Sequence, residues 1–166
     1  MPVLPVEALI AYQRALGITP TAAERNRLGP LNQHFADRFG WEELTREVAR
    51  IYAALPAEER GKVRIVTRNY GEAGAIDYYG RPYGLPLAVS PHNNYYLWGP
   101  GPDDAQVLIM VGWSSKELAG SFSQVEVAGR VESPYAMPFE TRWPIHLCRG
   151  LKAPLPEAWR QGKMFI

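Results

Sequence analysis

The stretch TRNYGEAGAIDYYG, residues 67–80, begins as the end of a strand and finishes as a helix, with a tight polar turn between them. The run KVRIVTRNY, which overlaps its start, is rich in β-branched residues and predicts a strand that ends near Asn69. The segment EAGAIDYYG predicts a helix of about two turns, with its acidic first turn at the positive end of the helix dipole. Such a strand–turn–helix unit is typical of a parallel sheet.

The same pattern continues toward the C-terminus. Further strands are predicted at LPLAVS, AQVLIMVG, QVEVAGRVES and RWPIHLCRG, and SSKELAGSF predicts a helix capped by Ser114 together with Glu117. Strands separated by helices form βαβ units with right-handed crossovers. We therefore expect an α/β fold, a Rossmann-like three-layer α/β/α sandwich with a mostly parallel or mixed sheet. The short crossover predicts that the strand ending at Asn69 lies beside the strand ending at Ser90, or one strand away.

The N-terminal part is predicted to be mainly helical. PVEALIAYQRALG has the spacing of a short amphipathic helix, and WEELTREVARIYAALPAEER carries a clear apolar face. Between them we expect a connection with at most one helical turn around residues 34–38. At 166 residues the chain fits one domain, residues 1–166, divided into a mainly helical part (1–60), a β/α core (61–150) and a C-terminal tail (151–166).

Composition narrows the classes of function. Eighteen basic and seventeen acidic residues leave a net charge of +1 without a block of like charge, so we expect no nucleic-acid partner. The longest apolar run, AQVLIMVGW, is too short to span a bilayer, and a soluble chain is expected. The three histidines lack metal-ligand spacing, the single Cys148 lies in an apolar strand, and no GxSxG motif occurs. We therefore expect no metal, no cofactor and no evident pair of nucleophile and base.

The first candidate site is the turn after the strand of residues 63–69. It presents Asn69, Tyr70, Gly71 and Glu72 where a helix begins, so that free backbone N–H groups could hold an anion or a carbonyl oxygen. Asp77, on the same helix, is a further candidate ligand-binding residue. An equally good interpretation is structural, with Asn69 capping the helix.

The second candidate site is the loop SPHNNYYLWGPG, which begins at Ser90. Aromatic faces and amide groups are the side chains that stack on sugars and hydrogen-bond to them. The alternative is a long connection whose aromatic residues complete the core while the asparagines form Asx turns. Both interpretations stay open for the candidate ligand-binding residues of this loop, which are His92, Asn93, Asn94, Tyr96 and Trp98.

Several strings resemble a known family. QHFADRFGWEELTREVARIY, NYGEAGAIDYYG and GLPLAVSPHNNYYLWGPG are similar to the soluble C-terminal region of bacterial membrane glycosyltransferases of the dolichyl-phosphate-mannose protein mannosyltransferase type. The resemblance covers nearly the whole chain. The family pattern after the second strand is more usually Ser-Gly-His-Asn-Ser-Tyr, so Pro91 and Asn94 are departures that affect the shape of this loop.

The resemblance implies a function for this region. The family carries its transferase chemistry in a polytopic membrane portion that uses a polyprenyl-phosphate sugar, and that portion is not in this chain. By this resemblance the chain is an extracytoplasmic accessory domain, tethered to the inner membrane in the full-length protein, that binds acceptor glycan, carrier head group or a partner such as the membrane-embedded transferase portion. The alternatives are a stand-alone α/β enzyme acting on a small polar substrate and a purely structural cap.

Overall fold

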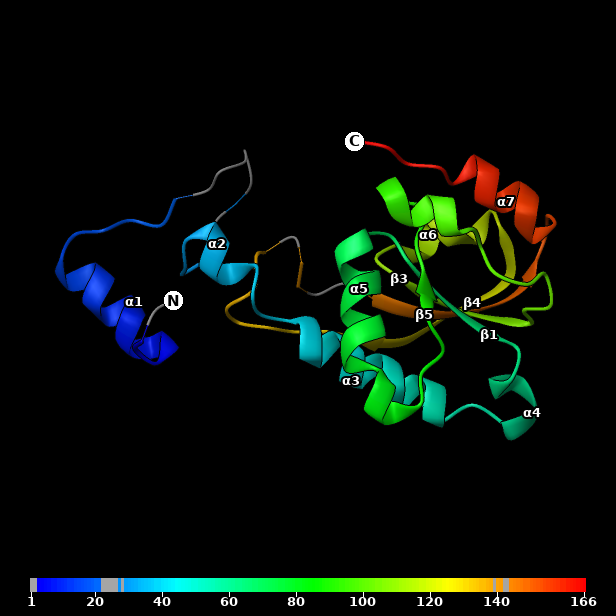
Figure 1. The fold of residues 1–166 in the computed structure, drawn as a ribbon, viewed down its shortest axis with the longest axis horizontal. Coiled ribbons are helices and arrows are strands. Elements are labelled where there is room, and N and C mark those ends of the chain that lie inside the picture. Colours follow the sequence, from blue (N-terminus) through cyan, green and yellow to red (C-terminus); the bar gives the residue numbers. More distant parts are fainter. Residues whose placement is uncertain (1–2, 22–26, 28, 139, 142–143) are drawn as a thin grey trace. The chain divides into compact units, whose positions relative to one another are not determined.

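The computed structural model describes residues 3–21, 27, 29–138, 140–141 and 144–166 (Figure 1). They belong to two compact units, each built from segments that are distant in the sequence. The first unit is Met1–Gly40 with Ser133–Arg142, and the second is Trp41–Glu132 with Trp143–Ile166. Both candidate turns lie in the second unit.

The first unit is small and helical. It contains α1 (Val6–Ala15) and α2 (Gln33–Ala36), so the predicted short helix and the single helical turn are both confirmed. Its core consists of Leu31, Ala36 and Met137, against which apolar side chains of α1 pack. The Tyr135 hydroxyl donates a 2.5 Å hydrogen bond to Glu7 of α1, which ties the segment after Ser133 to the N-terminal helix.

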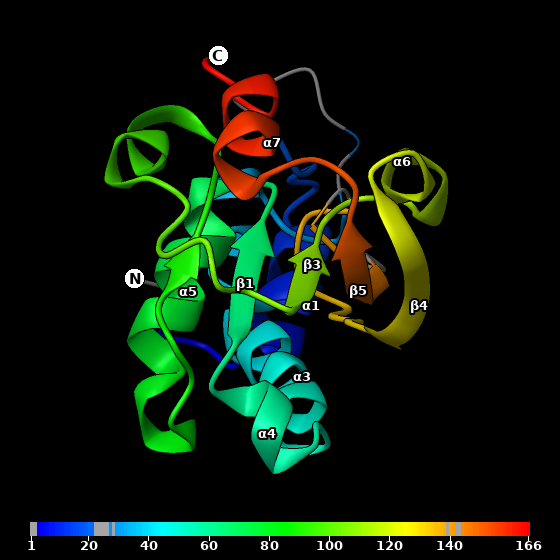
Figure 2. The ribbon, with the colours of Figure 1, turned by 90° about the vertical axis from the view of Figure 1, so that its right-hand side faces the viewer.

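The second unit is built on a five-stranded sheet with the order β2-β1-β3-β5-β4. Figure 2 shows β1, β3, β5 and β4 in this order across the sheet. β2 and β3 both pair with β1 in parallel, whereas β5 runs antiparallel to β3 and β4 antiparallel to β5. The strands are β1 (Val63–Thr67), β2 (Ala88–Val89), β3 (Val107–Val111), β4 (Phe122–Arg130) and β5 (Pro144–Leu151).

Helices pack against both faces of this sheet. In Figure 1 the strands lie between α3 (Trp41–Ala53) and α7 (Leu155–Gln161). One core joins α3 and α5 (Tyr70–Tyr79) to Val63, Ile65 and Ile109, and the other joins α6 (Ser115–Ala119) to Val66, Leu108 and Met110. Alternate residues of β1 and β3 thus face opposite cores, because side chains in a strand alternate between the two sides. The remaining short elements are α4 (Ala57–Arg60), η1 (Arg81–Tyr83) and η2 (Asn93–Trp98).

The structure confirms the α/β fold and establishes the direction of each strand in the sheet. The sheet is mixed: its three parallel strands are joined by the antiparallel pair β4 and β5. The predicted proximity of the strands ending at Asn69 and Ser90 is confirmed, since β1 and β2 are direct parallel neighbours. The finer prediction of a Rossmann-like three-layer sandwich stays a prediction. Residues 151–166, expected to be a tail, contain α7. Among the residues described, no helix has the length and apolarity to cross a bilayer.

Candidate functional site

The carboxyl ends of the parallel strands form one edge of the sheet. From this edge α5 follows β1 into one core, and α6 follows the neighbouring β3 into the other. Adjacent strands whose connections leave to opposite sides create a crevice, which is where open α/β sheets bind ligands. Both predicted turns lie at this edge, after β1 and β2.

The first turn is held by its own hydrogen bonds. The Asn69 side chain accepts from the Gly71 N–H over 2.7 Å, and the Glu72 carboxylate accepts from the Asn69 N–H over 3.1 Å. The two bonds form a capping box at the start of α5. The interpretation of Asn69 as a helix cap is therefore confirmed. A side chain at Gly71 would come within 3.3 Å of the Trp41 ring, so this position has little room for a Cβ atom.

The second loop meets the first turn at one contact. The Tyr70 N–H donates to His92 Nδ1 over 3.4 Å, and the two rings are 5.0 Å apart. His92 is only 4% exposed, while the Tyr70 side chain is half exposed. Burial lowers the pKa of His92 below its ordinary value, so the imidazole is neutral near pH 7.

One ring nitrogen of His92 is a hydrogen-bond donor without an acceptor among the described residues. Because Nδ1 accepts from a backbone N–H, the proton of the neutral ring lies on Nε2. Nε2 is buried and has no hydrogen-bond partner among the residues that the structure describes. Native proteins leave few buried polar groups unpaired, because each costs the free energy of desolvation. An acceptor atom from a ligand would satisfy this donor.

Asp77 has a role within the fold. Its Oδ1 accepts from the Ala88 N–H of β2 over 2.7 Å, and its Oδ2 accepts from the Tyr95 hydroxyl over 3.1 Å. Burial, and next the Asp77 charge, raise the pKa of Tyr95 to about 12. Asp77 thus fastens α5 to β2 and to η2, away from the contact of Tyr70 with His92.

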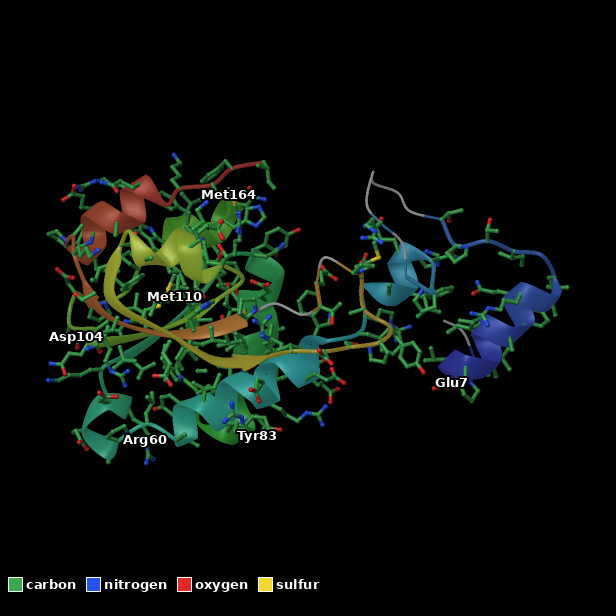
Figure 3. The ribbon with its side chains drawn as sticks, turned by 180° about the vertical axis from the view of Figure 1, so that it is seen from behind. Glu7, Arg60, Tyr83, Asp104, Met110 and Met164 are labelled. Atoms are coloured by element: carbon green, nitrogen blue, oxygen red, sulfur yellow. The ribbon has the colours of Figure 1, made fainter. Side chains whose placement is uncertain are left out.

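The rest of the second loop contacts the C-terminal segment. Asn93 has a φ of +50°, its N–H donates to the Met164 carbonyl, and its side chain accepts from the Ile166 N–H. Figure 3 labels Met164 on this segment. Tyr96 stacks on Trp159 of α7 with a ring separation of 5.6 Å.

Two of the candidate residues of the loop remain at the surface. Asn94 is exposed, and Trp98 is 72% exposed with its ring edge against Tyr95. Of the ten predicted site residues, the structure therefore brings together Asn69, Tyr70, Gly71, Glu72 and His92.

Sequence reasoning missed two pairs at the same edge. Ser115 Oγ lies 2.8 Å from Nε2 of the buried His146 on β5, and Arg68 forms a 2.9 Å ion pair with Glu117. Ser114 was expected to cap α6, and it does so with Glu117. The pairing with His146 had no sequence signal, because it depends on β5 being the antiparallel neighbour of β3. Burial, and next the Arg130 charge, lower the pKa of His146.

No group of histidine, cysteine and acidic side chains within the described ranges is arranged to hold a metal ion. In the comparisons with known proteins, no family model, no curated protein and no solved structure matches this chain.

Proposed function

We propose that this chain is an accessory module of a polyprenyl-phosphate-sugar-dependent membrane glycosyltransferase, and that on the extracytoplasmic side it binds acceptor glycan or carrier head group. The proposal starts from the resemblance of NYGEAGAID and HNNYYLWGP to such enzymes. One observation supports it: these two strings, 22 positions apart at Tyr70 and His92, meet at the ligand-binding edge of the sheet. The membrane-embedded transferase portion is the expected partner.

The chemistry of this edge suits a polar, oxygen-rich ligand. A sugar hydroxyl or phosphate oxygen accepts a hydrogen bond from His92 Nε2, which is otherwise unpaired among the described residues. Nε2 is buried, and the half-exposed Tyr70 ring lies 5.0 Å from the imidazole, so we expect a ligand to reach Nε2 when that ring turns aside. The displaced phenol then offers its face for stacking, as aromatic rings do in sugar sites.

A binding titration tests this proposal. Manno-oligosaccharides and a short-chain prenyl phosphate are added to the purified chain, and the amide resonances of Tyr70 and His92 are followed by NMR. His92→Ala is expected to weaken binding about tenfold or more, because a buried hydrogen bond is lost. His34→Ala is the matched control, since it makes the same change at an exposed histidine of the first unit. Absence of saturable shifts at millimolar concentration would contradict ligand binding and favour the structural cap.

Sugar transfer is expected to take place in the membrane portion. Incubation of the purified chain with a polyprenyl-phosphate sugar and an acceptor should give no product above the level without protein. Any product that depends on this chain would contradict the accessory role.

A second candidate function, a stand-alone hydrolase, is favoured by the contact of Ser115 with His146. For Ser115 Oγ to attack an acyl carbon, its proton must pass to His146 Nε2, which requires the ring proton on Nδ1. Nδ1 is buried and finds no acceptor among the described residues, so this tautomer lacks the usual orienting carboxylate. A fluorophosphonate probe tests this candidate: labelling that is lost in Ser115→Ala supports it, and absence of labelling excludes an activated serine.

A further inference from the structure

The second unit contains a cavity of about 170 Å³, partly open to solvent, on the face of the sheet that is opposite α3 and α5. Val66, Leu108 and Met110 form its floor, and Met110 is labelled in the interior of this unit in Figure 3. Leu118 of α6 contributes to another wall. The side that belongs to α7 is formed by Leu155, Ala158 and Trp159.

The lining of this cavity is mostly apolar. Trp113 and Phe122 add aromatic surface to the aliphatic side chains of the sheet and the helices. A buried water needs two to four polar partners, and such walls offer few. Water in this space is therefore weakly held, and its displacement by an apolar ligand is favourable.

Two charged side chains reach the lining, and both already have partners. Arg64 forms a 2.7 Å ion pair with Asp104 and donates to the carbonyls of Val63 and Pro102. Glu117 uses one oxygen for Arg68 and the other for the backbone and side chain of Ser114. A charged ligand would have to compete with these bonds, whereas an uncharged one leaves them intact.

We propose that this cavity binds a small uncharged apolar molecule of about the size of one aromatic ring. An engineered apolar protein cavity of about 150 Å³ binds benzene, which sets the size of ligand that a volume of about 170 Å³ can take. The driving force is the transfer of the ligand's apolar surface out of water, with a gain in dispersion contacts to the walls. This site is independent of the polar edge at Tyr70 and His92, so either proposal can fail without the other.

Toluene is a suitable probe, and the indole N–H resonances of the protein are suitable reporters. Trp113 and Trp159 line the cavity, whereas Trp41 and Trp98 do not. Addition of toluene to the full chain is expected to shift the Trp113 and Trp159 resonances in a saturable way and to leave those of Trp41 and Trp98 unchanged. Benzoate has the same ring with a charge, and it should bind at least about tenfold more weakly because a carboxylate is costly to desolvate.

Two substitutions from different walls test the location. Ala158→Leu extends α7 into the cavity, and Val89→Phe fills it from β2. Each is expected to weaken toluene binding at least about tenfold, because the added side chain occupies the ligand's volume. Ala119→Leu makes the same change as Ala158→Leu at an exposed position of α6 outside the lining, and it should bind as the unmodified chain does.

Three results would overturn the proposal. Absence of saturable shifts up to the solubility of toluene would show that the cavity takes no ligand. Unchanged affinity in a folded Ala158→Leu or Val89→Phe variant would place binding elsewhere. Equal affinity for benzoate would overturn the assignment of an uncharged ligand.

Discussion

The Tyr70 backbone N–H donates to His92 Nδ1 over 3.4 Å, and this contact joins the turn after β1 to the loop after β2. It exists because β1 and β2 are parallel neighbours whose carboxyl ends open on the same edge of the sheet. The contact fixes the tautomer of the buried imidazole and leaves its Nε2 as a donor. A polar turn on one strand thus controls the chemistry of a loop on another.

Replacement of Asn69 separates the capping role of this turn from a ligand-binding role. Asn69→Ala removes the acceptor for the Gly71 N–H, and the free energy of unfolding should fall by about 1 kcal/mol, the usual value of an N-cap. Asn69→Asp keeps an acceptor at the same place and should retain most of the stability. Urea denaturation of the two variants measures the difference. Equal losses in both would contradict the capping role.

The sequence was sufficient for those features that depend on neighbours in the chain. The helix N-caps at Asn69 and Ser114 follow from residue types at fixed offsets, and the strand around Ile65 follows from β-branched content. The parallel neighbours β1 and β2 follow from the short crossover between them.

Features that depend on the order of the strands in the sheet could not be predicted from the sequence. His146 approaches Ser115 only because β5 inserts between β3 and β4 and runs antiparallel to both. Strand composition does not encode that order. Likewise, the sequence left open whether Tyr96 offers its ring to a ligand or completes the core. The ring stacks on Trp159, a residue of α7 that lies 63 positions further along the chain.

The contact between Asp77 and Tyr95 should contribute to stability. Tyr95→Phe removes the hydroxyl donor and leaves Asp77 Oδ2 without this bond, so the free energy of unfolding should fall by about 1–2 kcal/mol. Asp77→Asn is the milder change, because the amide oxygen can still accept from the Ala88 N–H and the amide nitrogen can donate to the phenol. Urea denaturation should rank Tyr95→Phe as less stable than the unmodified chain, and no loss in this variant would refute the role of the bond.

Cys148 is expected to be inert in the folded protein. The residue is fully buried in the core between the sheet and α6, and burial raises the pKa of its thiol to about 12. A thiol reagent reacts with the thiolate, so the folded chain should not be modified near pH 8, whereas the chain unfolded in urea should react at its single cysteine. Ala119→Cys, at an exposed position of α6, provides a thiol that should react under native conditions. Rapid modification of the unsubstituted folded chain would contradict the burial of Cys148.

Stability should fall as the pH is lowered through the titration range of the two buried imidazoles. Burial lowers the pKa of His92 and of His146 from 6.5, so the unfolded chain takes up these protons at higher pH than the folded chain does. The part of the free energy of unfolding that depends on these neutral imidazoles is complete above the unfolded pKa of 6.5. It is lost progressively as the pH falls from there through the lower pKa values of the folded chain. The pKa of Glu117 is also lowered, chiefly by a backbone hydrogen bond from Ser114, and its contribution is lost only below the ordinary carboxyl value of 4.5.

The contribution of the two imidazoles can be measured apart from that of Glu117, which is lost only below pH 4.5. Free energies of unfolding from urea titrations at several pH values between about 7.5 and 5 should decrease toward acid. The decrease should be smaller in His92→Gln and in His146→Gln, because glutamine does not titrate. A pH-independent free energy of unfolding across this range would show that neither imidazole is held neutral by burial.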